Sequence, residues 1–277
     1  MRVGLIGAGN MARALARGWG EPVLCSDGGS GRAAALAAEL GGKAVASNRE
    51  LAERCDLVVL CHKPAQLEQV AAEIGGVARA VASVLGGIDP GRLQAAYPGT
   101  PTFQLMPNTP VEVRRGVICY ARVEGDPEAR ARAAELEPQV LERFARLGSV
   151  VEVPAALLEV ASALSGVGPA YVALLVEAQV DAAVRRGLGP SLAARLLAGT
   201  LAGTATLLEH RGYDTLAVRR EVTSPGGSTA RGLAALERAG VRTAFQEAID
   251  AVLDNRPPQA RPEGEASRAV GAGGGER

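Results

Sequence analysis

The most restrictive feature of this sequence stands at its start, where a short apolar run leads through a glycine-rich turn into a helical pattern. Residues 2–7 read RVGLIG, which is typical of a buried strand, and residues 11–19 carry the helical pattern. Between them, Gly7, Gly9 and Ala12 have the spacing G-x-G-x-x-A. Gly7 permits a tight turn, Gly9 lets a pyrophosphate approach the backbone, and Ala12 permits close helix–strand packing. The sequence therefore predicts a dinucleotide-binding unit whose helix N-terminus faces the anion.

Short apolar runs and helical stretches continue to alternate through roughly the first 150 residues. Continuous apolar runs suit parallel strands that are buried on both faces, and the helices between them supply the crossovers. We therefore expect an α/β Rossmann domain with a doubly wound, mainly parallel sheet over residues 1–152. Further strands are expected at 22–27, 43–47, 56–62, 80–86, 102–110, 116–122 and 148–154, with helices at 31–40 and 65–75.

The second half of the chain lacks strand patterns and reads as long helices, at 155–166, 169–187 and 190–212. The second of these helices is apolar on nearly all sides, more than a small helical domain buries by itself. A self-associating surface explains this pattern, and the alternative is a central helix in a larger bundle. An all-α domain is expected over 153–255. Residues 256–277 are rich in Gly, Pro and charge, which predicts a disordered tail.

Composition excludes several functional classes. The 277 residues carry no net charge and only 3% aromatics, so neither a polyelectrolyte partner nor a base-stacking platform is expected, and nucleic acid is excluded. The four cysteines lack metal-ligand spacing and stand in apolar surroundings, which predicts buried thiols, no metal site and a reduced cytoplasmic location. No signal peptide is apparent, and no window is expected to approach the roughly 20 apolar residues of a membrane span.

The end of the second predicted strand leaves the choice of dinucleotide open. Asp27 stands where an acidic residue accepts hydrogen bonds from a ribose 2′-hydroxyl, which points to NADH. Ser26, Ser30 and Arg32 are grouped nearby and suit a 2′-phosphate, which points to NADPH. Asp27 has a third interpretation, as a turn residue before Gly28.

Two further segments follow predicted strands in the same half of the chain. Lys63 is expected at the carboxyl end of a parallel strand, where ligands bind such sheets. Neither His62 nor His210 has the neighbours that a catalytic triad or a zinc site needs, so His62 is interpreted as a structural or solvated residue. The segment 106–110, MPNTP, is held rigid by two prolines and reads equally as a connector or a pocket wall.

A second glycine-rich loop, TSPGGST, stands directly before a helical pattern at 230–239. Its small polar groups and free amides, together with the positive end of the helix, would attract a carboxylate. The alternative is an ordinary helix cap made by a hydroxyl. The candidate substrate-binding residues are Ser224, Gly226, Gly227, Ser228 and Thr229.

Six segments in order through about residues 1–252 carry a wider resemblance. They are GLIGAGNMARA, KPAQ, MPNTP, LSGVGPAYV, DAAVRRGL and VTSPGGSTARGLAALERAGVRTAFQEAI. Together they resemble the pyrroline-5-carboxylate reductase family. The resemblance implies a Rossmann domain followed by a helical dimerisation domain, assembled as a homodimer or a larger ring of dimers. It also implies NADPH- or NADH-dependent reduction of a cyclic imino acid, 1-pyrroline-5-carboxylate, to L-proline, with hydride delivered to the imine carbon.

The same resemblance implies roles for individual residues. The pyrophosphate would be surrounded by Gly7, Gly9, Asn10 and Met11. Asn48 matches a family position that contacts the adenosine ribose or its phosphate. The nicotinamide end would be flanked by Lys63, Pro64 and the MPNTP loop with Asn108. Thr229 would place its hydroxyl beside the ring nitrogen of the substrate, where it orients the iminium and passes a proton.

Two other functions remain open on the sequence alone. A β-hydroxyacid-type dehydrogenase shares the plan of a Rossmann domain followed by helices, but relies on a lysine in the helical part. Here the lysines are Lys43 and Lys63, both in the N-terminal half. The other alternative is a non-catalytic dimer that senses dinucleotides and binds no carboxylate at the 224–229 loop.

Overall fold

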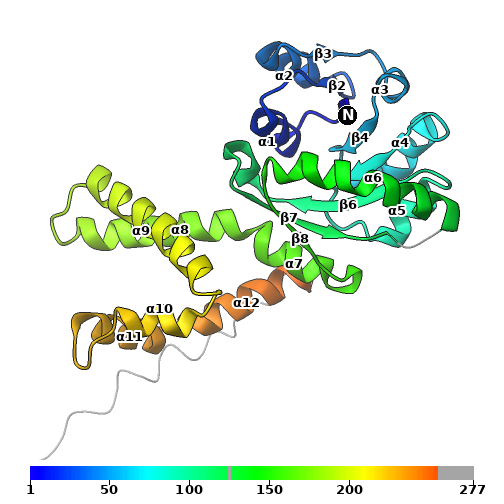
Figure 1. Cartoon of the computed structure of the whole chain (residues 1–277). Coiled ribbons are helices and arrows are strands. Elements are labelled where there is room, and N and C mark those ends of the chain that lie inside the picture. Colours follow the sequence, from blue (N-terminus) through cyan, green and yellow to red (C-terminus); the bar gives the residue numbers. More distant parts are fainter. Residues whose placement is uncertain (124–125, 255–277) are drawn as a thin grey trace, which may run out of the picture. The chain divides into compact units, whose positions relative to one another are not determined.

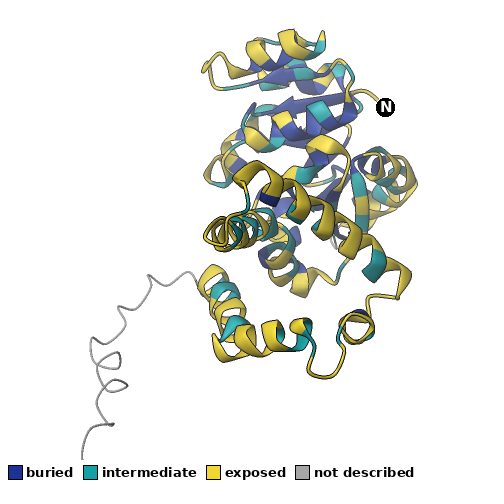
Figure 2. Cartoon of the chain, turned by 90° about the vertical axis from the view of Figure 1, so that its left-hand side faces the viewer, coloured by how far each residue is buried: buried dark blue, intermediate teal, exposed yellow. Residues whose placement is uncertain are grey.

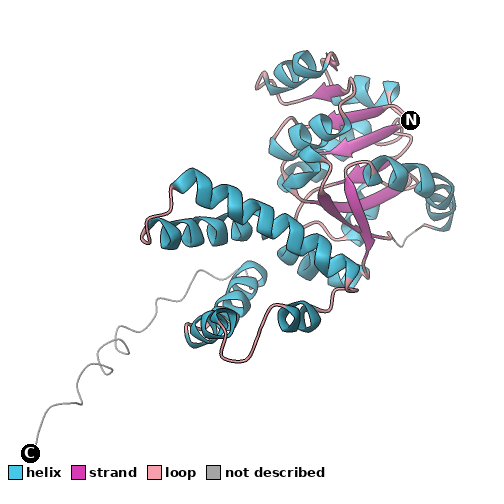
Figure 3. Ribbon diagram, turned by 60° about the vertical axis from the view of Figure 1, so that its left-hand side comes forward, coloured by secondary structure: helices cyan, strands magenta, loops and turns pink. Residues whose placement is uncertain are grey.

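The computed structural model describes residues 1–123 and 126–254 of the chain (Figures 1 and 3). The chain divides into two compact units, Met1–Arg219 and Arg220–Arg277. The domain boundary expected after residue 152 coincides with the end of the last strand, and it stays a prediction. The tail expected over 256–277 lies outside the described residues.

The first unit is built on an eight-stranded sheet with the order β3-β2-β1-β4-β5-β6-β7-β8. Every neighbouring pair is parallel except β6 and β7, which are antiparallel. After β3 the chain crosses back over β1 to form β4, so the strand order reverses between β1 and β4. The predicted doubly wound, mainly parallel fold is confirmed. The strands are β1 (Val3–Ile6), β2 (Leu24–Ser26), β3 (Lys43–Ala44), β4 (Leu57–Leu60), β5 (Val81–Ser83), β6 (Thr102–Pro107), β7 (Gly116–Ala121) and β8 (Gly148–Glu152).

Alternate residues of the central strands belong to two separate hydrophobic clusters, one on each face of the sheet. In β4, Leu57 and Val59 belong to one cluster while Val58 and Leu60 belong to the other, as expected for a strand covered on both faces. The first cluster lies under α1 (Asn10–Trp19) and α6 (Pro127–Ala145), and the second lies under α3 (Asn48–Arg54), α4 (Leu67–Ile74) and α5 (Pro90–Ala96). Helix α2 (Arg32–Leu40) covers β2 and β3.

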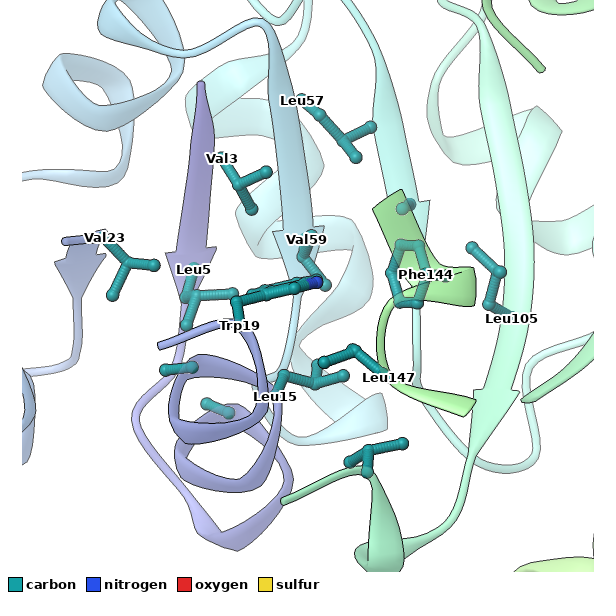
Figure 4. Packing of buried hydrophobic residues seen from close by; sticks show 14 of the residues in the cluster. Val3, Leu5, Leu15, Trp19, Val23, Leu57, Val59, Leu105, Phe144 and Leu147 are labelled. Atoms are coloured by element: carbon teal, nitrogen blue, oxygen red, sulfur yellow. The ribbon is translucent and has the colours of Figure 1, made fainter. Parts of the chain in front are cut away.

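The first cluster is centred on two aromatic side chains from distant parts of the chain (Figure 4). Trp19 of α1 meets Phe144 of α6 edge to face, with 5.6 Å between ring centroids. The Trp19 indole N–H donates to the carbonyl of Arg143 at 3.0 Å, so the buried ring leaves no donor unpaired. Each such side chain contributes roughly 2–3 kcal/mol on burial, and the pair fixes the helix that carries the first glycine loop.

Beyond β8 the chain is helical, and most of this helical surface is exposed (Figure 2). Helix α7 packs on β6 and β7, whereas α8 has no fully buried residue and α9 has one, Ala193. Leu174 and Leu196 are 63% and 56% exposed. The elements of this part are α7 (Leu158–Ser165), α8 (Gly168–Val184), α9 (Pro190–His210) and α10 (Thr215–Glu221), and the second unit holds α11 (Ser228–Arg238) and α12 (Val241–Leu253), which contact each other.

Two helical segments, Ala155–Val184 and Pro190–His210, are long and apolar enough to cross a membrane by length and composition. The expectation that no window approaches the length of a membrane span is therefore wrong. Leucine, alanine and valine raise the mean hydropathy of both segments, although glycine and hydroxyl-bearing residues interrupt their apolar runs. The cysteines are free, as expected, and three of the four are buried.

Candidate functional site

Gly7 makes the turn after β1 in a backbone conformation that favours glycine. Its φ is +97°, and a Cβ at this position would lie 2.6 Å from the backbone carbonyl of Cys61. The Gly7 amide donates to the carbonyl of Ser26 at 2.8 Å. Gly7 therefore lies between the carboxyl ends of β1, β2 and β4, at the point where the strand order reverses and where open α/β sheets bind their ligands.

Gly9 leaves the N-terminus of α1 open. It is the cap residue of the helix, it makes no side-chain cap bond, and a Cβ placed on it would meet no atom within 4 Å. Within the described chain, the amides of Asn10, Met11 and Ala12 have no acceptor, and the first turn of the helix holds no acidic residue. Free amides beside open space at a positive helix end fit the pyrophosphate of a dinucleotide.

The Asp27 carboxylate binds the first turn of α2, whose N-cap position is occupied by Gly31. One carboxylate oxygen accepts from the Gly29 amide at 2.9 Å, and the other accepts from the Ser30 hydroxyl at 2.8 Å and the Ala33 amide at 2.9 Å. These bonds, that from Ala33 first, hold the pKa of Asp27 below its usual value. The geometry agrees with the turn interpretation of Asp27, and its contact with a ribose stays a prediction.

Ser26 and Asn48 are brought together, although 22 residues separate them in sequence. The buried Ser26 hydroxyl donates to the side-chain oxygen of Asn48 at 2.6 Å, and the Asn48 amide nitrogen donates to Glu73 at 2.5 Å. These two residues, predicted to bind the cofactor, thus form one hydrogen-bonded chain that ends on α4. The chain orients the Asn48 amide at the edge of the sheet beside the first glycine loop.

Lys63 and Pro64 follow β4 and begin a short 3-10 helix, Pro64–Gln66. The Lys63 amide donates to the side chain of Gln66 at 3.2 Å, and the Lys63 ammonium group is exposed. The neighbouring His62 has its ring Nδ1 2.9 Å from the Lys63 carbonyl, while its Nε2 is buried without a partner. Burial lowers the pKa of His62, which favours the neutral ring. The ring is therefore fixed to the local backbone, as the structural interpretation of His62 expects.

Asn108 uses both ends of its side chain within the protein. Its oxygen accepts from the Val117 amide at 2.8 Å and its nitrogen donates to the Ser165 carbonyl at 3.1 Å. The side chain is almost fully buried. It joins the MPNTP loop to the end of α7, where the LSGVGPAYV segment begins. No sequence pattern indicates Ser165 as the partner of Asn108. Contact of Asn108 with a nicotinamide stays a prediction.

The second glycine loop, in the second unit, forms a tight turn. The Gly227 amide donates to the Ser224 carbonyl at 3.0 Å, with Pro225 and Gly226 between them and Gly226 at φ +69°. A proline followed by a glycine with positive φ is the signature of a type II turn. A Cβ on Gly227 would lie 2.4 Å from the Ser224 hydroxyl oxygen, so the hydroxyl folds over this glycine. The amide of Gly227 is thus used by the turn.

Backbone amides without an acceptor stand at the start of the helix that follows this turn. Helix α11 begins at Ser228 without a side-chain cap, and in the described residues the amides of Ser228, Thr229 and Ala230 have no acceptor. The first turn of α11 has no acidic residue, and Thr229 is half-buried. The Arg231 side chain, which the sequence analysis did not single out, donates back to the Gly226 carbonyl at 2.7 Å. The loop is therefore a rigid, positively polarised helix start that suits a carboxylate.

No metal-binding group is found in the part of the chain that the structure describes: no three His, Cys, Asp or Glu side chains gather as ligands. Burial raises the pKa of both Cys25 and Cys55 to about 11, which disfavours their reactive thiolate forms. Chemistry at these sites therefore depends on backbone amides, hydroxyl groups and a bound cofactor.

A reversing parallel sheet with an open glycine loop, followed by a helical region with a second anion-attracting loop, defines a nicotinamide-dinucleotide-dependent oxidoreductase of the Rossmann type. A family model described as pyrroline-5-carboxylate reductase dimerisation matches residues 155–256, and one described as NADP oxidoreductase coenzyme F420-dependent matches residues 2–85. The chain belongs to the pyrroline-5-carboxylate reductase family, and its C-terminal half carries the oligomerisation region of that family.

Individual relatives agree with this assignment. The chain is 38% identical to a pyrroline-5-carboxylate reductase of Synechocystis sp., covering 74% of this chain and 75% of the relative. It is 34% identical to pyrroline-5-carboxylate reductase 3 of Mus musculus, covering 90% and 93%. Among solved structures, the Streptococcus pyogenes 1-pyrroline-5-carboxylate reductase has a TM-score of 0.79 at 27% identity, covering 92% and 97%. The Plasmodium falciparum pyrroline carboxylate reductase, with NADP bound, has a TM-score of 0.78 at 27% identity, covering 91% and 95%.

Proposed function

We propose that this protein reduces 1-pyrroline-5-carboxylate to L-proline with NADPH or NADH as the reductant, the last step of proline biosynthesis. One observation carries the proposal. The segment that matches the family's dimerisation model, residues 155–256, contains the turn and the helix start whose free amides suit the carboxylate of this substrate. The relatives and the solved structures named above support the same reaction.

The chemistry needs one hydride and one proton for each C=N bond reduced. The bound reduced nicotinamide supplies the hydride to the imine carbon. In the proposed arrangement, the start of α1 binds the pyrophosphate, with Lys63, Pro64 and Asn108 near the nicotinamide end. The amides of Ser228, Thr229 and Ala230 hold the carboxylate, and the Thr229 hydroxyl orients the ring nitrogen, which takes up the proton. Holding both partners in place supplies much of the rate enhancement in such reactions.

The loop after β2 supports NADPH over NADH. Both oxygens of Asp27 already accept hydrogen bonds, so this carboxylate has less capacity left for ribose hydroxyls. Arg32 donates to the Ser30 hydroxyl at 3.0 Å and has no ion-pair partner among the described residues. The remaining N–H donors of the Arg32 guanidinium suit a 2′-phosphate.

The oligomer we propose is a homodimer formed through the exposed apolar faces of α8 and α9, which assembles further into a ring of dimers. Helices that bury almost nothing within one chain need such a partner. Covering these faces with a second copy, rather than with lipid, fits two predictions that stay open: a cytoplasmic location and no membrane partner. The expectation that no nucleic acid binds also stays a prediction.

A spectrophotometric assay tests the proposed function. Pyrroline-5-carboxylate is added to the purified protein with NADPH or NADH, and the loss of absorbance of the reduced cofactor is followed together with the formation of L-proline. We expect turnover with both cofactors and a higher kcat/KM with NADPH. If neither cofactor is oxidised while both bind, the non-catalytic dinucleotide sensor becomes the better reading.

A further inference from the structure

Arg231 is placed to control the proposed carboxylate loop from the side of the helix. It stands at the fourth position of α11, and its side chain runs back toward the start of the helix, the usual direction for long helical side chains. There one guanidinium nitrogen donates to the Gly226 carbonyl at 2.7 Å. The residue is exposed, so it meets this loop at the surface of the second unit.

This hydrogen bond completes a clamp on a single peptide group. The peptide that joins Gly226 to Gly227 has its N–H donated to the Ser224 carbonyl at 3.0 Å and its C=O held by Arg231 at 2.7 Å. Gly226 would otherwise be free to leave its left-handed conformation, because glycine populates both signs of φ with little preference. The clamped peptide is the one before the peptide that carries the Ser228 amide, so the Arg231 side chain holds the loop that leads into the free amides of α11.

The charge of Arg231 is not neutralised within the described part of the chain. None of the ion pairs there involves Arg231, whereas Arg242 in the same unit makes three hydrogen bonds to Glu237. A guanidinium has five N–H donors, and the Gly226 carbonyl occupies one nitrogen. An unpaired cation therefore stands beside the free amides of Ser228 and Thr229, at a helix start that already attracts anions.

We propose that Arg231 is a positioning residue that sets the selectivity of the loop for an anionic substrate. It does so by clamping the Gly226–Gly227 peptide and by adding a positive charge beside the carboxylate. This inference rests on the proposed function and names a residue through which that function discriminates substrates. Arg231 touches neither the imine nor the cofactor in this role, so it acts on binding and leaves the hydride step unchanged.

The test compares Arg231→Gln and Arg231→Lys with Arg238→Gln. Arg238 is also an exposed arginine of α11, but it lies in the last turn, about 10 Å along the helix axis. For Arg231→Gln we expect KM for pyrroline-5-carboxylate to rise about tenfold, as for the loss of one charge-assisted hydrogen bond, with kcat and the Kd of NADPH within about twofold of wild type. Arg231→Lys keeps the charge but lacks the planar guanidinium, so its KM should lie between those of wild type and Arg231→Gln. Arg238→Gln should match wild type.

A second readout separates charge recognition from loss of local structure. L-Proline and L-prolinamide differ in the carboxylate, and we measure the inhibition of the NADPH-loaded enzyme by each. L-Proline should inhibit wild type at lower concentration than L-prolinamide does. In Arg231→Gln the ratio of the two inhibition constants should become about tenfold smaller, and inhibition by L-proline should depend less on salt concentration. An unchanged preference in Arg231→Gln, or an equal change in Arg238→Gln, overturns the role of Arg231.

Failure of the proposed function gives a different pattern. If wild type does not reduce pyrroline-5-carboxylate, the activity assignment is wrong, and titration of the NADP⁺-loaded protein with L-proline then decides the inference by itself. Binding that weakens in Arg231→Gln supports the role of the clamp. Binding that is absent in wild type, or equal in the variants, overturns it.

Discussion

Asn108 donates a hydrogen bond from its side-chain nitrogen to the backbone carbonyl of Ser165, 57 residues further along the chain, at 3.1 Å. The other end of the same side chain accepts from the Val117 amide at 2.8 Å. One buried carboxamide thus ties together the loop after β6, the second residue of β7 and the last residue of α7. The end of α7, from which the exposed helical region continues, is therefore anchored directly to β7 and to the loop after β6.

Replacement of Asn108 by aspartate tests this link. The change keeps the acceptor for Val117 but turns the donor toward Ser165 into a second acceptor, so two oxygens face each other in a buried place. We expect the free energy of unfolding to fall by about 1–3 kcal/mol, the cost of a buried polar group without its partner. Asn108→Ala should cost more, since it also leaves the Val117 amide unpaired. Urea denaturation measures both values, and an aspartate variant as stable as wild type contradicts the assigned geometry.

Alanine replacements in the first glycine loop should separate folding from cofactor binding. A Cβ on Gly9 meets nothing in the protein, so Gly9→Ala should keep the wild-type melting temperature and still obstruct the approach of a pyrophosphate. We expect the Kd of NADPH, followed by its fluorescence, to rise about tenfold or more, equivalent to about 1.4 kcal/mol.

Gly7→Ala is the matched control for that prediction. Its Cβ would lie 2.6 Å from the Cys61 carbonyl in a backbone conformation that alanine disfavours. This variant should lose stability by several kcal/mol even without cofactor. Equal melting temperatures for the two variants would show that the loop does not have this shape.

Asp27 should make the stability of the α2 cap depend on pH in the acid range. Its pKa is lowered in the folded protein by hydrogen bonds from the Ala33 amide and its neighbours, so folding favours the ionised form. The stabilisation is therefore complete above the unfolded pKa of about 3.9 and is lost as pH falls through the folded value. At pH 7, Asp27→Ala should unfold with about 1 kcal/mol less free energy than wild type. Urea denaturation at several pH values should show this difference shrinking below about pH 4, and a constant difference would show that the carboxylate is no cap.

The sequence was most informative where short-range patterns determine structure. The G-x-G-x-x-A spacing after an apolar run predicted the turn at Gly7 and the open helix start at Gly9, because both depend on a few consecutive residues. Helix α6 was missed: it is strongly charged and holds Pro138 within it, so no clean apolar period announces it. Its burial depends on Phe144 meeting Trp19, a contact between distant segments.

The candidate sites show the same difference between local patterns, which the sequence reveals, and contacts between distant segments, which it does not. Residue types and their order located the TSPGGST loop, yet the Gly227 amide closes the turn, while the amides of Gly226 and of Ser228–Ala230 have no acceptor among the described residues. The Pro-Gly pair was a signal for that turn, since a type II turn uses the amide of its fourth residue. The bonds of Asn108 to Ser165 and of Arg231 to Gly226 depend on tertiary approach and on a rotamer choice, which residue order leaves undetermined.

Thr229 bears on the source of the proton that the imine nitrogen of the substrate carries. Within the loop 224–229 the side chains are hydroxyls, a proline and glycines, so none titrates near neutral pH. If the imine arrives already protonated, kcat/KM should follow the ionisation of the substrate and not that of the enzyme. Thr229→Ala should then lower kcat/KM about tenfold at every pH, since about 1.4 kcal/mol of orienting hydrogen bond is lost, and leave NADPH binding unchanged. Thr229→Ser keeps the hydroxyl and should retain most of the activity. A pH profile of kcat/KM whose midpoint departs from the pKa of the substrate would contradict the arrival of a protonated imine, and an unchanged rate in Thr229→Ala would remove Thr229 from the reaction.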